Sequence, residues 1–235
     1  MKRNTGQEDS ILEIKIFNSE NFQDLCNHLA DRDPDFKTIL DTHGYPPMWT
    51  RENTFETLVH IILEQQVSLA SALAALNKLK EKTTKITPES ILNLNDEEMR
   101  ACYVSRQKSV YIRGLAQAIT DKHLSLEELS AMTNDDARKN LVKLKGIGNW
   151  TVDVYLMFTL QRADIFPIGD LAAVNALKRL KQLPTSITKE EILEISEQWK
   201  PFRSVASIML WHYYLSQPAK RIFHFRIYNI YPLCH

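Results

Sequence analysis

Two glycines separated by a single residue, Gly146 and Gly148, lie within an apolar pattern of helical spacing. The apolar residues that recur on either side of them are Leu141, Leu144, Ile147 and Val154. Because glycine has no Cβ, the backbone can turn tightly here, and the pattern predicts two helices joined by a very short connection. The unpaired N–H groups of the second helix and of the turn would point outward together, which favours a phosphate. An ordinary αα-hairpin that needs glycines explains the same pattern.

The segment after this turn leads to an aspartate at the start of a further helix. Residues 152–160 are almost wholly apolar, which predicts a buried central helix. The run 165–169, Ile-Phe-Pro-Ile-Gly, cannot continue that helix, and Asp170 then precedes the helical pattern of residues 171–180. Aspartate is among the preferred N-cap residues, so capping alone would account for Asp170. The same position favours a charged carboxylate, so capping and chemistry are compatible.

Four ordered motifs resemble those of one family. The runs L-K-G-I-G-N-W-T (144–151) and F-P-I-G-D (166–170) are similar to the signature of the helix-hairpin-helix (HhH-GPD) DNA glycosylases. The runs I-L-E-Q-Q-V-S (62–68) and W-K-P-F-R-S-V-A (199–206) resemble the 3-methyladenine DNA glycosylase II branch of that superfamily. The resemblance covers roughly residues 34–214. It implies an all-α fold of two helical lobes with a DNA-binding cleft between them.

The resemblance also implies one glycosylase unit over residues 1–235, built of two interleaved helical lobes, with the hairpin and catalytic loop at about 134–183. The tail 218–235 is aromatic and β-like in propensity, and no role is assigned to it. Residues 11–17 alternate between apolar and polar and predict a short strand or an extended lead-in. The other periodic segments predict helices over 18–30, 36–40, 54–63, 68–79, 88–100, 104–119, 124–132, 189–199 and 203–214.

Residues of two turns become candidates for DNA contact through the resemblance. Those of the hairpin are Lys145, Gly146, Gly148 and Thr151. In the family a side chain from the loop at Gln65 and Gln66 fills the gap left by the extruded nucleotide, and Gln66 matches that wedge. On the sequence alone, a helix end with solvated amides is the simpler explanation of the two glutamines. The cations on the predicted helix 104–119 have the same two explanations, contact with phosphates or ordinary solvation: Arg106, Lys108 and Arg113.

Recognition of the base is expected to rely on aromatic faces. A flipped base stacks in a pocket, and a cationic base is attracted to the rings of Trp and Tyr. Trp150 and Trp211 match family positions near the pocket, and Tyr155 is a further candidate. Trp49 and Tyr213 are weaker candidates. Each of these rings is equally well explained as a core aromatic.

The implied reaction is hydrolysis of the N-glycosidic bond of an alkylated purine, of the 3-methyladenine or 7-methylguanine type, which leaves an abasic site. The resemblance implies that Asp170 is the catalytic residue, and one charged carboxylate would suffice for a base that already leaves readily. Family members that also cut the DNA backbone carry a lysine at the position of Trp150, so the enzyme is expected to be monofunctional. No iron–sulfur cluster is expected, because only Cys234 lies near the C-terminal end, and no metal site is expected either. In the family, carbonyls of the hairpin can hold a monovalent cation.

Composition gives mild evidence against nucleic acid as the partner. The formal net charge is +0 and the isoelectric point about 7.1, whereas many DNA-binding proteins are basic. The distribution of the cations matters more than their sum, and several lie around the motifs: Lys143, Lys145, Lys178, Arg179 and Lys181. The expected partner is double-stranded DNA with damaged bases, bound by a monomer, without a membrane. The expected place is the cytoplasm and nucleoid of a bacterium or the nucleus of a eukaryote.

Three alternatives remain open from the sequence. A glycosylase of the same fold for deaminated or oxidised bases would share every motif, because pocket residues decide the substrate. A non-catalytic helix-hairpin-helix DNA-binding protein would share the hairpin but would not require Asp170. An α-helical interaction protein without any role on DNA would fit the neutral charge.

Overall fold

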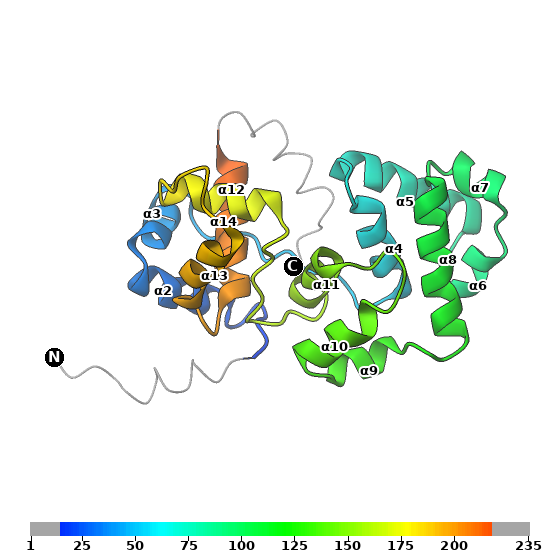
Figure 1. Ribbon diagram of the computed structural model, residues 1–235, viewed down its shortest axis with the longest axis horizontal. Helices are drawn as coiled ribbons and strands as arrows, with labels where there is room; N and C mark the ends of the chain where they lie inside the picture. Colours follow the sequence, from blue (N-terminus) through cyan, green and yellow to red (C-terminus); the bar gives the residue numbers. More distant parts are fainter. Residues whose placement is uncertain (1–14, 218–235) are drawn as a thin grey trace. The chain divides into compact units, whose positions relative to one another are not determined.

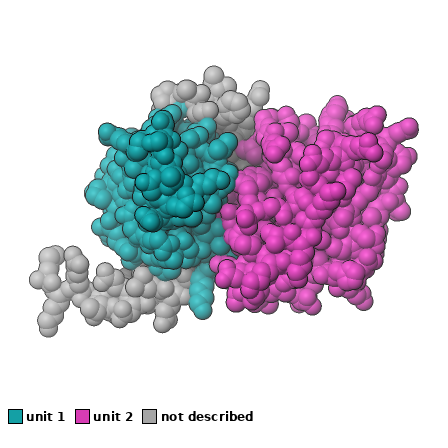
Figure 2. All heavy atoms as spheres, viewed as in Figure 1, with its two compact units in different colours: residues 1–50, 161–235 teal, residues 51–160 magenta. Residues whose placement is uncertain are grey.

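The computed structural model describes residues 15–217, and the chain divides into two compact units. Unit 1 combines Met1–Thr50 with Gln161–His235, whereas unit 2 is the continuous segment Arg51–Leu160 (Figure 2). Between residues 15 and 217 the regular secondary structure is helical (Figure 1). One isolated antiparallel bridge joins Ile16 and Arg162 in that range. The all-α prediction is therefore confirmed.

Unit 1 is built around its last helix. Its described helices are α2 (Phe22–Arg32), α3 (Pro34–His43), α12 (Leu171–Leu180), α13 (Lys189–Glu197) and α14 (Arg203–Ser216). Helix α14 packs against α12, α3 and α2, and most of its residues are buried. The loop before α12 and the C-terminal half of α14 are thereby held in one core.

Unit 2 is built around two apolar helices. Its helices are α4 (Phe55–Glu64), α5 (Leu69–Thr83), α6 (Pro88–Leu92), α7 (Asp96–Ala101), α8 (Arg106–Thr120), α9 (Leu126–Ala131), α10 (Asn134–Leu141) and α11 (Asn149–Phe158). Helix α4 packs against α5, α8 and α11. In α11 every residue from Thr151 to Phe158 is buried, which confirms the prediction of a buried central helix after the glycine turn.

The structure corrects one predicted helix. The segment 88–100 forms two helices, α6 and α7, instead of one. The side chain of Asn95 accepts a bond from the backbone N–H of Glu98, and the Glu98 carboxylate accepts one from the N–H of Asn95. This capping box starts a new helix where the periodic pattern alone runs on. The predicted lead-in 11–17 lies mostly, and the tail 218–235 wholly, outside the described residues.

The connection between α10 and α11 depends on a glycine. Gly146 has φ 88, in the left-handed region, and a Cβ added there would lie 2.1 Å from Cγ of the Tyr111 ring in α8. A residue with a side chain would therefore meet both backbone strain and a steric clash. This packing explains why the hairpin needs its first glycine.

Among residues 15–217, no helix has the combination of length and apolar character that crossing a membrane requires.

Replacement of Gly146 by alanine should lower the free energy of unfolding by about 2–4 kcal/mol, because strain and clash add. Gly114 lies within α8. A Cβ added there would meet no atom within 4 Å besides the backbone of its own helix, so Gly114→Ala should raise the free energy of unfolding by about 0.5–1 kcal/mol. Urea denaturation of both variants and the wild type measures the two values. A Gly146→Ala protein as stable as the wild type would contradict the assignment of the turn.

Candidate functional site

Asp170 is held by three N–H donors. It is the N-cap of α12, and its Oδ1 accepts bonds from the backbone N–H groups of Ala172 at 3.0 Å and Ala173 at 2.9 Å. The indole Nε1–H of Trp211, in α14, donates to the same oxygen at 3.0 Å. The residue is only 6% exposed. The predicted N-cap is confirmed, and the indole adds a fixing contact from a second helix.

The short loop before α12 sets the position of this carboxylate. The backbone N–H of Ile168 donates to the carbonyl of Phe166 at 2.9 Å, and that of Asp170 donates to the carbonyl of Pro167 at 2.8 Å. Two tight turns, over residues 166–168 and 167–170, thus both include the proline, whose ring prevents a helix from continuing through it. The chain reverses and presents Asp170 directly at the first turn of α12.

Two tryptophans lie next to each other beside Asp170 in unit 1. The ring centroids of Trp49 and Trp211 are 6.2 Å apart, with an angle of 57° between the ring planes. Trp211 is partly buried, whereas Trp49 is 2% exposed. Of the predicted pocket aromatics, Trp211 is therefore the one that the structure joins to the carboxylate within one unit.

Two further candidate pocket aromatics, Trp150 and Tyr155, belong to α11 in unit 2. Trp150 is partly buried in the first turn of that helix. Tyr155 is fully buried, and its hydroxyl donates to Oδ1 of Asn53 at 2.7 Å. Complete burial with an internal hydrogen-bond partner is typical of a core aromatic, the alternative role for Tyr155.

The hairpin leaves the start of α11 without a side-chain cap. Side chains cap most of the described helices, among them α4 through Thr54, α5 through Ser68 and α8 through Ser105. Gly148, the N-cap of α11, makes no such bond and is exposed. The first N–H groups of a helix attract anions, and this end presents them without a competing side chain.

The turn that carries Gln66 follows α4 directly. Gln66 is exposed and has φ 57, an uncommon backbone conformation for a residue other than glycine. The Nζ of Lys108 donates to the carbonyl of Leu63 at 2.7 Å, and burial lowers the pKa of this lysine. The sequence makes Lys108 a candidate for phosphate contact, whereas the structure engages it with the end of α4.

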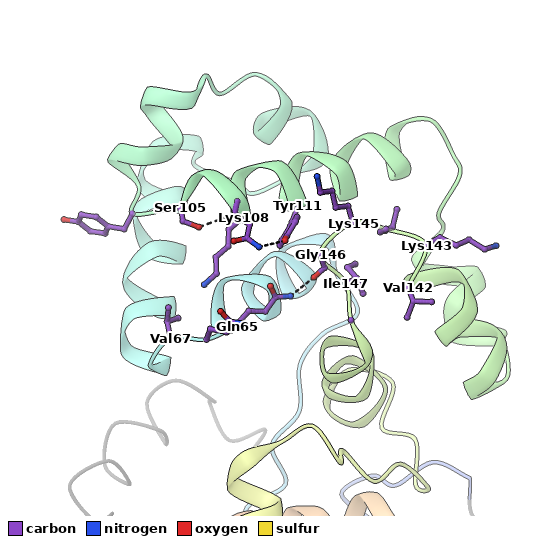
Figure 3. Close-up of a pocket in the computed structure, with 15 residues that line it drawn as sticks. Gln65, Val67, Ser105, Lys108, Tyr111, Val142, Lys143, Lys145, Gly146 and Ile147 are labelled. Carbon is purple, nitrogen blue, oxygen red and sulfur yellow. Dashed lines mark hydrogen bonds between the residues drawn. The ribbon is translucent and has the colours of Figure 1, made fainter. Parts of the chain in front are cut away.

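A side-chain amide joins this turn to the hairpin. Nε2 of Gln65 donates to the carbonyl of Gly146 at 2.8 Å (Figure 3). It also donates to Oγ1 of Thr151, in α11, at 2.9 Å. Thr151 is 2% exposed. Its predicted contact with DNA stays a prediction, while its hydroxyl has this internal partner. Neighbouring Gln66 and Gln65 thus differ: one is exposed, and the other is tied inward.

The two turns border one groove of unit 2, with a volume of about 690 Å³. The groove is lined by residues 65–67, by the hairpin residues 142–148, by two residues ahead of α8 and by three within it: Tyr103, Ser105, Gln107, Lys108 and Tyr111 (Figure 3). Lys143 and Lys145 are exposed at the hairpin. The predicted DNA-contact residues Gln66, Lys145, Gly146 and Gly148 therefore lie around the same groove.

A buried ionic group fixes the last turn of α4, directly before the turn that carries Gln66. Nη2 of Arg51 contacts both carboxylate oxygens of Glu64, at 2.8 and 3.0 Å. Nε2 of His60 lies 3.4 Å from Oε1 of Glu64, and burial lowers the pKa of His60. Because the neutral histidine is favoured, Arg51 is the cation that balances Glu64.

Gln65, Lys108 and Trp49 have structural roles that the sequence patterns do not assign. The sequence pattern predicts that Gln65 and Gln66 form a solvated helix end. The signal for its role is its place within the same motif as Gln66, but its partner Gly146 is 81 positions away. In residues 15–217 no group of three or more His, Cys, Asp or Glu residues is arranged to hold a metal ion.

These features define an all-α, helix-hairpin-helix protein with a turn suited to an anion and a fixed, buried carboxylate. The chain belongs to the HhH-GPD superfamily of base excision DNA repair proteins, whose family model matches residues 59–202.

Similar proteins agree with this family assignment. DNA-3-methyladenine glycosylase 1 of Schizosaccharomyces pombe is 34% identical over 191 residues, which are 78% of this chain and 84% of the relative. The structure of the S. pombe 3-methyladenine DNA glycosylase Mag1 in complex with abasic DNA has a TM-score of 0.72 at 32% identity, covering 80% of this chain and 95% of that chain. A DNA-3-methyladenine glycosidase from Bacillus halodurans has a TM-score of 0.69 at 27% identity, covering 80% and 88%.

Capping and chemistry at Asp170 can be separated by substitution. Asparagine caps helices about as well as aspartate, so Asp170→Asn should change the free energy of unfolding by less than about 0.5 kcal/mol. Asp170→Ala should lower it by about 1–2 kcal/mol, because the first turn of α12 loses its acceptor. Urea denaturation measures both. An asparagine variant as destabilised as the alanine variant would show that charge, and not capping, stabilises this turn.

Proposed function

We propose that the protein is a monofunctional DNA glycosylase that hydrolyses the N-glycosidic bond of alkylated purines in double-stranded DNA and leaves an abasic site. The observation that carries the proposal is the buried carboxylate of Asp170, fixed by two backbone N–H groups and the indole of Trp211. Support comes from the family and from relatives named DNA-3-methyladenine glycosylase. One chain supplies both this carboxylate and the hairpin, so we propose that it acts as a monomer.

A single carboxylate is sufficient for this reaction. Cleavage of the N-glycosidic bond develops positive charge on the deoxyribose, as in other glycoside hydrolyses. A charged carboxylate stabilises that cation electrostatically and orients the water that attacks it. An alkylated purine carries positive charge and departs without strong help from a general acid. Asp170 therefore suits an electron-poor, damaged base better than a normal one.

The hairpin and the turn at Gln66 supply the contacts with DNA in this proposal. The uncapped N-terminus of α11 and the exposed Lys143 and Lys145 suit a backbone phosphate. Gln66, exposed on its turn, fills the gap that the extruded nucleotide leaves. Trp150 occupies the position at which a Schiff-base mechanism would need a lysine, so strand cleavage by this protein is not expected.

The proposal is tested with methylated duplex DNA. The assay measures free 3-methyladenine and 7-methylguanine released by the wild type and by Asp170→Asn, each with and without hot alkali. We expect release by the wild type, at least about a hundred-fold slower release by the variant, and strand breaks only after alkali.

Other results would redirect or overturn the proposal. Release by Asp170→Asn at the wild-type rate would remove Asp170 from the mechanism. Strand breaks without alkali would contradict the monofunctional assignment. Absence of release despite tight binding to abasic DNA would direct the search to deaminated or oxidised bases, and absence of both would overturn the glycosylase proposal.

The indole of Trp211 should matter for rate more than for binding. Trp211→Phe keeps an aromatic ring but removes the N–H that contacts Asp170, so single-turnover excision should slow about five- to ten-fold while duplex affinity stays unchanged. Trp199→Phe is the matched control, because the Nε1–H of Trp199 donates to Asp33, the N-cap of α3, at 2.9 Å. An equal loss of excision rate in the control would mean that Trp211 acts only through stability.

A further inference from the structure

We propose that Gln65 is a positioning residue that ties the turn bearing Gln66 to the hairpin, so that the hold on the DNA backbone and the insertion of Gln66 occur in one fixed register. The inference rests on the proposed function and assigns a role to Gln65 that differs from that of its neighbour.

The hydrogen bonds of Gln65 reach both parts of the hairpin. A glutamine amide has two N–H donors, and Nε2 of Gln65 bonds two acceptors, the carbonyl of Gly146 in the turn and Oγ1 of Thr151 in α11. Gln65 is partly buried and Thr151 is almost completely buried, so water competes poorly for these bonds. The glycine turn and the start of α11 are thus both fixed to the residue that precedes Gln66.

The backbone ahead of Gln66 is fixed from further sides. Lys108, in α8, holds the carbonyl of Leu63, and Arg51 holds the carboxylate of Glu64. Three successive residues, 63–65, are therefore each bonded to a segment distant in sequence. The side chain of Gln66 itself is exposed.

The backbone conformation of Gln66 explains why these hydrogen bonds matter. A non-glycine residue at φ 57 is held in a sparsely populated region, and such strain persists only where the surroundings determine it. Without the Gln65 bonds the turn can relax to a commoner conformation, which moves the Gln66 side chain. Preorganisation of an inserting side chain lowers the free-energy cost of ordering it on binding. Loss of Gln65 should therefore weaken binding where insertion contributes and spare binding where it does not.

The test compares two duplexes, one with a tetrahydrofuran abasic analogue and one undamaged. Gln65→Leu removes the amide while keeping a similar side-chain size. We expect the preference of the protein for abasic over undamaged duplex to fall about ten-fold, with undamaged affinity changed less than about two-fold. Gln117→Leu is the matched control. Gln117 is exposed in unit 2, and the hydrogen bond that the structure shows for its side-chain amide goes to the nearby Asp121.

A double-mutant cycle separates positioning from general loosening of the hairpin. If Gln65 acts through Gln66, Gln65→Leu should change the abasic preference less than about two-fold in a Gln66→Ala background. Thermal unfolding of all variants, followed by circular dichroism, reports whether each remains folded. Gln65→Glu, which keeps the length but lacks the N–H donors, should reproduce the loss seen with Gln65→Leu.

Two outcomes would overturn the inference: an unchanged abasic preference in Gln65→Leu, whether both affinities stay the same or fall equally, or additive effects in the cycle. The binding ratio needs no base release, so it is independent of the substrate. A wild type that prefers abasic DNA but releases no methylated purine would contradict the proposed function and leave the role of Gln65 measurable. A wild type without any abasic preference would overturn both.

Discussion

The first backbone N–H groups of a helix have no partners within that helix and need acceptors from elsewhere, and this need underlies both of the helix starts on which the proposed function rests. At α12 the requirement is met by Asp170, which brings a carboxylate into a buried position. At α11 the N-cap is Gly148, and no side chain occupies the place of a cap. One helix start thus holds an anion of the protein itself, and the other is suited to an anion of a ligand.

The conformations of the short turns in this protein are fixed by side chains from distant parts of the sequence. The indole of Trp211 reaches Asp170 from 41 positions away, and Lys108 reaches Leu63 from 45 positions away. These bonds connect elements that the apolar core already brings together, α12 with α14 and α4 with α8. Packing sets the approximate approach of the helices, and the polar contacts then fix the orientation of each turn.

Local patterns are sufficient for the features that depend on neighbouring residues. The glycine turn, the buried helix after it and the cap at Asp170 can all be predicted, because helical period and cap chemistry act within a few positions. The break within residues 88–100 does not follow from the pattern, since the capping box at Asn95 competes with a continuous apolar period. The tie from Gln65 to Gly146 and the burial of Thr151 are beyond such patterns, because they depend on which helices meet in three dimensions.

The division of the chain has a consequence for its synthesis. Unit 2 is continuous and is complete once residue 160 has been made, whereas unit 1 still needs α12, α13 and α14. Domains generally fold as units while the chain grows from its N-terminus. On the ribosome the hairpin with its Gln65 contacts can therefore form before Asp170 and its indole partner exist. In the proposed function, the part of the chain that contacts the DNA backbone would then exist before the part that hydrolyses the glycosidic bond.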